Sequence, residues 1–184
     1  MIFHRLGLIN RNQLGFTLLE LMLAIAISGI ITGAITTTIF QVVTGTARTN
    51  NHMTVVKQVE SAGYWVSRDA QMAQHVYLEW GGETPVGSKF PLRLTWTDWN
   101  SNDAHQVIYT LEIGGEPKRL VRSHSINGGE PTEAIVAQYI VPGLAKTSLD
   151  FTNGVLTFTV TATMGTGSQE QSETRVYKIV PRPG

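Results

Sequence analysis

A run of 27 consecutive residues without a charged side chain, Leu21 to Ala47, constrains this chain more than any other feature of its sequence. As a helix with a rise of roughly 1.5 Å per residue, the 23 residues from Leu21 to Val43 would be about 35 Å long, enough to cross a bilayer with some tilt. A single carboxylate, Glu20, lies at the start of this apolar segment, and the leader before it contains two arginines and no acidic residue. The sequence therefore predicts a membrane-anchoring helix that follows a short basic leader.

The small residue that marks a possible processing site is Gly15, and it comes before the apolar segment. In a secretory signal the cleavage site follows the apolar core, so the core is discarded with the leader. Cleavage after Gly15 would instead keep the apolar segment as the start of the mature chain, beginning at Phe16. By the positive-inside rule the leader should remain cytoplasmic, which predicts a single-pass protein whose residues after Val43 lie outside the membrane.

Residues 15 to 20 read Gly-Phe-Thr-Leu-Leu-Glu, and this junction with its apolar run resembles the class III signal of type IV pilins and type II secretion pseudopilins. The resemblance implies cleavage after Gly15 by a prepilin peptidase, N-methylation of Phe16, and pairing of Glu20 with the N-terminus of a neighbouring subunit. Gly29 falls where many major pilins carry a glycine that loosens the helix. Thr37 falls where those pilins usually have a proline, so the chain departs from the pattern there.

Three short segments further along are similar to minor subunits of these filaments, the J-type minor pseudopilins and the W-type minor pilins: Ser67-Arg68-Asp69-Ala70, Leu120-Val121-Arg122 and Val180-Pro181-Arg182. The likeness implies a subunit that helps to initiate or build a filament, and it marks Asp69 as a possible partner contact. The alternative for Asp69 is an ion pair or cap near the helix end, with Arg68 or a sheet residue. The implied partners are the prepilin peptidase and methyltransferase, other pilin or pseudopilin subunits, the inner-membrane assembly platform and membrane lipid.

The carboxylate of Glu20 has a physical reason to be paired. Acidic residues at the centre of a membrane helix cost on the order of 2.5 to 3.5 kcal/mol by insertion scales, so such residues are usually functional. Attraction to the Phe16 ammonium, at about 4 Å and an effective dielectric near 20, is roughly 4 kcal/mol and offsets this cost. Because Phe16 and Glu20 are four residues apart, a contact within one chain competes with a contact between chains. A further alternative places Glu20 at the depth of the bilayer interface, where it is solvated.

Gly29 and Gly33 form a small-xxx-small spacing within the apolar segment. Small residues at this interval let helix backbones approach closely, which suits packing in a filament core. The alternative is that glycine is simply frequent in membrane helices.

Beyond the anchor, one apolar face continues the helix as an amphipathic one. The residues of this face recur at steps of three and four: Val55, Val59, Ala62, Val66, Ala70 and Ala73. No proline occurs between Phe16 and Val76, so a single helix of about 61 residues is expected. Its second half should pack on the part of the chain that follows.

Alternating apolar and polar residues then predict strands. The predicted strands are 92–97, 107–113, 149–152, 155–162 and 175–180, with Asn153-Gly154 as a hairpin turn. The expected fold class is α+β, a long N-terminal helix packed on an antiparallel sheet of roughly six or more strands. The expected divisions are a leader at 1–15, a membrane and filament-core helix at 16–43, an amphipathic helix at 44–80 and a sheet domain at 81–184.

The loop after the first predicted strand carries Asp98, Asn100 and Asn102, a spacing that hard oxygen ligands have in calcium loops. Position six of such a loop is Asp103 here instead of glycine, and position twelve is Tyr109 instead of glutamate. A polar hairpin tip is the alternative interpretation of these residues.

Composition limits the other function classes. The chain contains no cysteine, which removes disulfides, thiolate metal sites and cysteine nucleophiles, and it shows no motif of an enzyme or cofactor site. Without the leader it has 12 basic against 14 acidic residues, so nucleic acid is not an expected partner.

A small basic cluster, Lys118, Arg119, Arg122 and His124, lacks a neighbouring row of aromatic residues in the sequence and is interpreted as a solvated edge strand. Two other function classes remain open beside the structural subunit. One is a major pilin, and the other is a pilus-tip binding module, an adhesin or a DNA receptor, which an exposed Trp99 beside the basic cluster would favour. The expectation is a structural protein and not an enzyme.

Overall fold

The computed structural model describes residues 15–78 and 89–182. By internal contacts the chain divides into two compact units, Met1–Val43 and Thr44–Gly184. A single helix, α1, of 55 residues (Leu18–Met72) runs through both units. In the first unit, every described residue is exposed.

The helix begins at a local capping signal. The backbone N–H of Glu20 donates to the Thr17 hydroxyl at 3.3 Å, and the N–H of Leu21 donates to the Thr17 carbonyl at 3.1 Å. Thr17 and Glu20 thus have the spacing of a capping box, Thr-x-x-Glu, in which the threonine hydroxyl satisfies a backbone donor that the first turn leaves unpaired.

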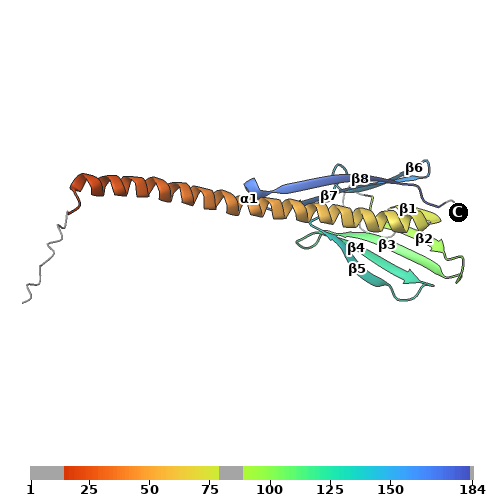
Figure 1. Ribbon diagram of the computed structural model, residues 1–184. Coiled ribbons are helices and arrows are strands. Elements are labelled where there is room, and N and C mark those ends of the chain that lie inside the picture. The colour runs from red at the N-terminus through yellow and green to blue at the C-terminus, as the bar shows by residue number, and fades with distance from the viewer. Residues whose placement is uncertain (1–14, 79–88, 183–184) are drawn as a thin grey trace, which may run out of the picture. The chain divides into compact units, whose positions relative to one another are not determined.

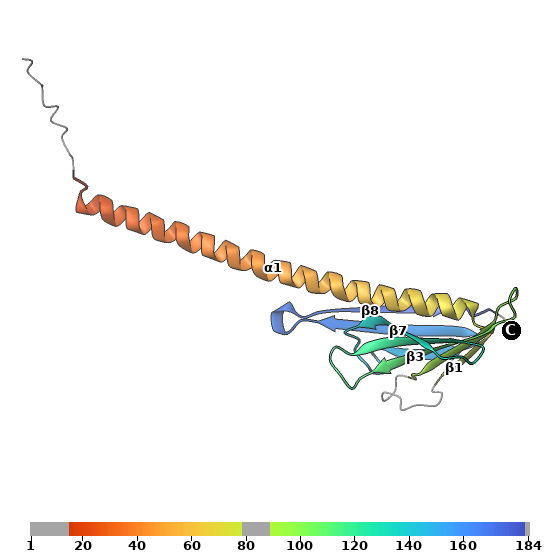
Figure 2. The ribbon, with the colours of Figure 1, turned by 90° about the horizontal axis from the view of Figure 1, so that it is seen from below.

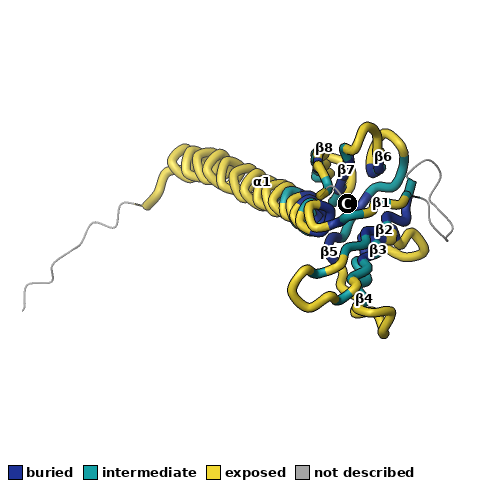
Figure 3. The backbone as a smooth tube through the Cα atoms, turned by 90° about the vertical axis from the view of Figure 1, so that its right-hand side faces the viewer, coloured by how far each residue is buried: buried dark blue, intermediate teal, exposed yellow. Residues whose placement is uncertain are grey.

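The second half of α1 buries the face that the sequence predicts. All six residues of the expected apolar face have no exposed surface, and the last of them directly follows the end of the helix: Val55, Val59, Ala62, Val66, Ala70 and Ala73. Figure 3 shows these buried positions on the side of the helix that faces the strands. This prediction is confirmed.

Within the described residues, eight strands follow the helix: β1 (His75–Leu78), β2 (Leu92–Thr97), β3 (Ala104–Glu112), β4 (Arg119–Ile126), β5 (Thr132–Gln138), β6 (Ser148–Thr152), β7 (Val155–Met164) and β8 (Gln171–Ile179). They form two antiparallel sheets, one in the order β1-β2-β3-β4-β5 and one in the order β6-β7-β8. Figure 1 shows the two sheets on either side of the second half of α1. The predicted α+β fold, a long helix on antiparallel sheet, is confirmed.

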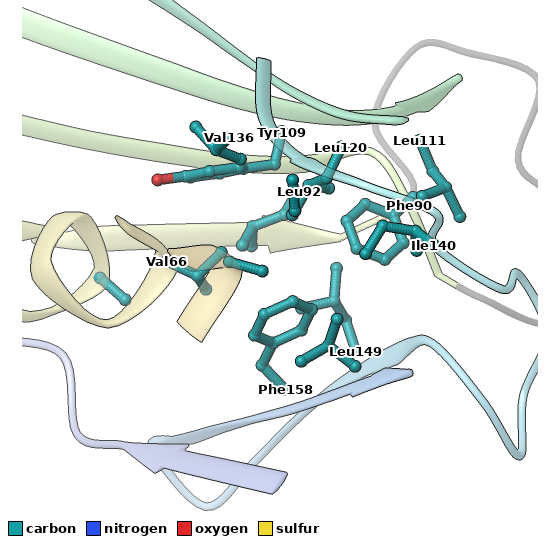
Figure 4. Packing of buried hydrophobic residues seen from close by; sticks show 14 of the residues in the cluster. Val66, Phe90, Leu92, Tyr109, Leu111, Leu120, Val136, Ile140, Leu149 and Phe158 are labelled. Atoms are coloured by element: carbon teal, nitrogen blue, oxygen red, sulfur yellow. The ribbon is translucent and has the colours of Figure 1, made fainter. Parts of the chain in front are cut away.

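The helix holds both sheets through its buried face and a few polar contacts, and Figure 2 shows how it lies along them. Val66 lies between Leu92 of the five-stranded sheet and Phe158 of the three-stranded sheet (Figure 4). Phe90, just before β2, meets Phe158 edge to face with ring centroids 6.4 Å apart. One hydrophobic core therefore joins the helix and the two sheets.

On the β8 side, Gly63 of the helix lies against the side chain of Tyr177. The Tyr177 hydroxyl donates to the Val59 carbonyl at 3.1 Å, and its ring occupies the place where a side chain on Gly63 would begin. Only glycine allows this contact, because a Cβ there would lie 2.0 Å from the ring.

Three expectations from the sequence are wrong in detail. The amphipathic helix expected to reach residue 80 ends at Met72, and His75–Leu78 is a strand that pairs with β2. In β1 the side chains of Val76 and Leu78 pack on the core, while those of His75 and Tyr77 are exposed. This two-residue period covers only four residues directly after the helix, which is too short to distinguish a strand from one more helical turn. The single sheet is two sheets, and β4, the strand with the basic cluster, is an interior strand between β3 and β5 instead of an edge.

Candidate functional site

The predicted assembly segment, Gly15 to Glu20, lies at the start of α1 with its side chains in the open. Phe16 is 86% exposed, and Glu20 lies in the first helical turn. Within the described residues Glu20 takes part in no ion pair. An acidic residue in the first turn interacts favourably with the positive end of the helix dipole, so Glu20 has a local stabilising role besides any contact with another chain.

The helix behind Glu20 is long and apolar enough to cross a membrane, with a mean hydropathy of 2.2 in its most apolar window. Gly29 and Gly33 lie on this helix, and a Cβ on either would meet nothing within 4 Å. The described residues of the chain thus leave both glycines uncovered, and a packing role for them depends on another helix.

Three threonines in the same segment form hydrogen bonds from their hydroxyls to backbone carbonyls of the helix itself. The hydroxyls of Thr36, Thr37 and Thr38 donate to the carbonyls four residues earlier at 2.8, 2.8 and 2.9 Å. This masks three polar groups that lipid could not satisfy. The helix continues unbroken through Thr37, where major pilins usually have proline.

Asp69, the predicted partner contact, is completely buried and bound within the domain. Its carboxylate accepts a hydrogen bond of 2.5 Å from the Tyr109 hydroxyl and bonds of 2.6 and 3.2 Å from Nε and Nη2 of Arg122. Burial and the neighbouring Asp69 charge raise the pKa of Tyr109, so the phenol keeps its proton and acts as a donor.

The expected partner contact by Asp69 is therefore wrong, and the alternative of an ion pair with a sheet residue is what the structure shows. The two short segments that resemble minor subunits, Ser67-Arg68-Asp69-Ala70 and Leu120-Val121-Arg122, meet in this single ion pair. Tyr109 carried no signal in the sequence beyond its place in the alternation of β3, because its partner is 40 residues away.

Arg122 and the helix residue Arg68 both lie over the indole of Trp65, at 5.2 and 5.6 Å from the ring centre. On the same face of the sheet, the ring of Trp96 stacks on His105 with centroids 5.1 Å apart, and Nδ1 of His105 lies 3.1 Å from Nε2 of His124. The fold thus supplies aromatic neighbours for Arg122 and His124 that are distant in the sequence.

The basic cluster itself does not gather on one surface. Lys118 pairs with Glu116 at 3.5 Å, and the side chain of Arg122 is only 15% exposed in its ion pair with Asp69. Arg119 and His124 occupy positions of β4 that face opposite sides of the sheet. The observation that would have favoured a DNA receptor, Trp99 beside a basic cluster, is therefore only half met.

Asp98 and the other weak metal candidates form the tip of the β2–β3 hairpin. The Asp98 carboxylate accepts hydrogen bonds from the backbone N–H groups of Asn100 and Ser101 at 2.8 and 3.2 Å, and these bonds lower its pKa. Asn102 has a left-handed backbone with φ of 60°. These contacts are those of a polar hairpin tip, and no three His, Asp or Glu side chains within 15–78 and 89–182 converge as metal ligands.

Comparison with known proteins places the recognisable part of the chain at its N-terminal end. A protein family described as the prokaryotic N-terminal methylation motif matches residues 10–36. Neither the curated proteins nor the solved structures contain a match. The match covers the leader junction, Phe16 and Glu20, and it supports a class III signal and a type IV pilin-like protein, with processing by a prepilin peptidase and assembly with other pilin-type subunits.

Proposed function

We propose that this chain is a minor pilin or pseudopilin, a non-enzymatic structural subunit that helps to initiate or build a type IV pilus or a type II secretion pseudopilus. The observation that carries the proposal is the contrast at the start of α1: the methylation motif at 10–36 opens a helix that stays apolar and entirely exposed up to Val43. Such a surface needs lipid before assembly and other helices after it.

The proposed course of events begins at the membrane. The basic leader stays on the cytoplasmic side of the inner membrane, a prepilin peptidase cuts after Gly15, and Phe16 becomes the N-methylated first residue. The domain after Thr44 lies on the outer side. The assembly platform then transfers the helix from lipid into the filament, where Glu20 pairs with the N-terminal ammonium of a neighbouring subunit.

Two roles of Glu20 can be separated by a single substitution. A capping box accepts glutamine as well as glutamate, so Glu20→Gln preserves the local role beside Thr17 and removes only the charge. If the carboxylate pairs with an ammonium, Glu20→Gln should be processed and inserted normally but recovered in sheared filaments at least about tenfold less than wild type, because roughly 4 kcal/mol of attraction is lost.

Thr17→Ala is the matched control, since it removes the cap and keeps the charge. It should assemble nearly as well as wild type. Equal recovery of Glu20→Gln and wild type, with poor recovery of Thr17→Ala, would show that Glu20 serves the helix end and would remove the pairing role.

The minor role rests on the likeness of three short segments to minor subunits, two of which meet at Asp69 and Arg122. A minor subunit that initiates assembly should be present in far fewer copies than the major subunit, and its deletion should lower the number of filaments. Quantitative mass spectrometry of sheared filaments in the native host tests this. If the chain is the most abundant filament protein, it is a major pilin.

A further inference from the structure

The tip of the β2–β3 hairpin presents a tryptophan that the domain leaves in water. Trp99 is 90% exposed, more than any other large apolar side chain of the described residues. A tryptophan buries a large area when a partner covers it, and exposed tryptophans are frequent centres of binding energy. The residue is thus a candidate for recognition outside the filament core.

The turn that carries Trp99 is braced at both of its ends. The backbone N–H of Asp98 donates to the Asp103 carbonyl, and the N–H of Asn102 donates to the Asp98 carbonyl, both at 2.9 Å. The Asp98 carboxylate accepts two further backbone bonds inside the turn. Trp99 is therefore held on a fixed support, and little backbone order has to be gained on binding.

The turn after β4 forms hydrogen bonds with the β2–β3 turn. Asn127, which follows β4, donates from its backbone N–H to the Ala104 carbonyl at 2.7 Å, and its side-chain oxygen accepts from the Ala104 N–H at 2.8 Å. Its side-chain nitrogen donates to the Asp103 carboxylate at 2.7 Å. Asn127 is accordingly a positioning residue for the hairpin tip.

Trp99 borders two hollows, with volumes of about 310 and 470 Å³. Both are lined by Thr97, Asp98 and Trp99. The smaller also takes in Gln71, Asn100 and Arg182, and the larger takes in Gln74 and Asn102. Trp99 thus shares the lining of both hollows with amide side chains and the Asp98 carboxylate, and that of the smaller one also with the Arg182 guanidinium.

This lining favours one class of ligand over two others. An interface core with another protein is apolar and depleted in charge, whereas here Met72 and Trp96 are the apolar neighbours of Trp99 among amides and charged groups. Nucleic acid would bring phosphates near Asp98 and Asp103, whose carboxylates stay ionised because hydrogen bonds lower their pKa values.

A saccharide matches both parts of the site. The apolar C–H face of a sugar ring can lie on the indole, and its hydroxyls can donate to Asp98 and exchange hydrogen bonds with the flanking amides. Each hollow is large enough for one sugar ring, so the arrangement suits a short oligosaccharide that crosses Trp99. We propose that the β2–β3 tip is a saccharide-binding site, with Trp99 as its stacking platform and Asp98, Asn100, Asn102 and Arg182 as its polar contacts.

The test uses the full-length protein in phosphocholine micelles, because maltoside detergents would offer sugar to the site. The probes are chitotriose, cellotriose, maltotriose and lactose, each titrated while the indole N–H signals are followed by NMR. At least one probe should shift the Trp99 signal with a dissociation constant on the order of 1 mM, as expected for one stacking contact at an open site.

Variants then assign the site. Because these variants lack the Trp99 indole signal, binding is compared in all proteins through the backbone amide signals of residues 98–103. Trp99→Ala should weaken binding at least about tenfold, and Trp99→Phe should restore part of it, since a smaller ring still stacks. The control Tyr64→Ala removes another exposed aromatic, 60% exposed on α1 and outside both hollows, and should bind like wild type. Asn127→Ala should weaken binding less than Trp99→Ala, and it should broaden the amide signals of residues 98–103, a change that loss of a direct contact would not cause.

The proposal is overturned if no probe shifts the Trp99 signal, or if Tyr64→Ala and Trp99→Ala weaken binding equally. It is also overturned if a decathymidylate binds at Trp99 while the sugars do not, since the ligand would then be single-stranded nucleic acid. Because all measurements use the unassembled chain, failure here leaves the filament role of Glu20 unaffected.

Discussion

The two halves of helix α1 belong to the same continuous helix but differ in how their apolar side chains are buried. From Leu18 to Val43 every residue is exposed, whereas from Val55 to Ala70 one face is completely buried under two sheets. The first half carries its apolar residues all round, and the second confines them to one side. The second half packs on the chain's own sheets, and the proposed function gives the first half lipid and other subunits to pack against.

Polar groups follow the same division. In the first half, three threonine hydroxyls bind carbonyls of their own helix, and Glu20 takes part in no ion pair within the described residues. In the second half, Asp69 is bound by Tyr109 and Arg122 from two strands. The free energy of folding of the domain should therefore depend on the second half and hardly on the first.

The largest effect is expected at the junction that defines the first half. Gly15→Leu should block cleavage, because the peptidase site requires a small residue there, and should leave a precursor about 15 residues longer than the mature chain. Gel mobility and N-terminal sequencing in the native host measure this. Gly7→Leu in the leader is the control and should be processed. A wild-type protein that begins at Met1 in that host would contradict the assignment of the junction.

In the second half, the strongest single change is expected at the buried ion pair. Asp69→Ala should lower the free energy of unfolding by about 3–5 kcal/mol, because Arg122 is left as a charge without its carboxylate. Asp150→Ala breaks the exposed pair with Lys89 and should cost less than about 1 kcal/mol. Urea unfolding followed by tryptophan fluorescence compares the two. Equal effects would mean that burial of Asp69 does not matter for stability.

Replacing either of two glycines of α1 with alanine should change the free energy of unfolding in opposite directions. Gly63→Ala should destabilise the domain by about 1–3 kcal/mol, since the added methyl meets the Tyr177 ring. Gly45→Ala meets nothing within 4 Å and should raise stability by up to about 1 kcal/mol through helix propensity. If Gly63→Ala stabilises the domain as Gly45→Ala does, the close approach of β8 to the helix is not what Gly63 serves.

The smallest effect is a pH dependence at His124. Burial, Arg122 and His105 lower its pKa, so below the unfolded value of about 6.5 the unfolded chain binds the proton more readily than the folded one. Stability should therefore fall as the pH drops from about 6.5 through the lowered folded pKa. His124→Gln should remove this component, while the exposed His52→Gln should retain it. Equal slopes in all three proteins would exclude His124 as the source.

The features that the sequence predicts best depend on local spacing. The apolar face from Val55 to Ala73 repeats at helical steps, and five strands alternate with a period of two, so helix and strands are found close to their expected places. The sequence does not predict the end of the helix, because β1 has only four residues, too few for its two-residue period to stand out against the helix before it. The sequence does not predict β4, because arginine and histidine interrupt its apolar residues. It does not predict β5 either, because most residues of that strand are exposed and show no alternation of buried and exposed positions.

The sequence by itself predicts the processing junction, and it determined the apolar segment and the buried face of the helix, because each follows from residues close together in the chain. Only the tertiary structure decided that Asp69 is an internal ion pair, that Trp96 stacks on His105, and that Asn127 braces the turn of Trp99. These contacts join residues 9 to 53 positions apart in the chain, and the register between strands and helix sets them. No local sequence pattern predicts this register, because it depends on how the helix and both sheets pack together in one hydrophobic core.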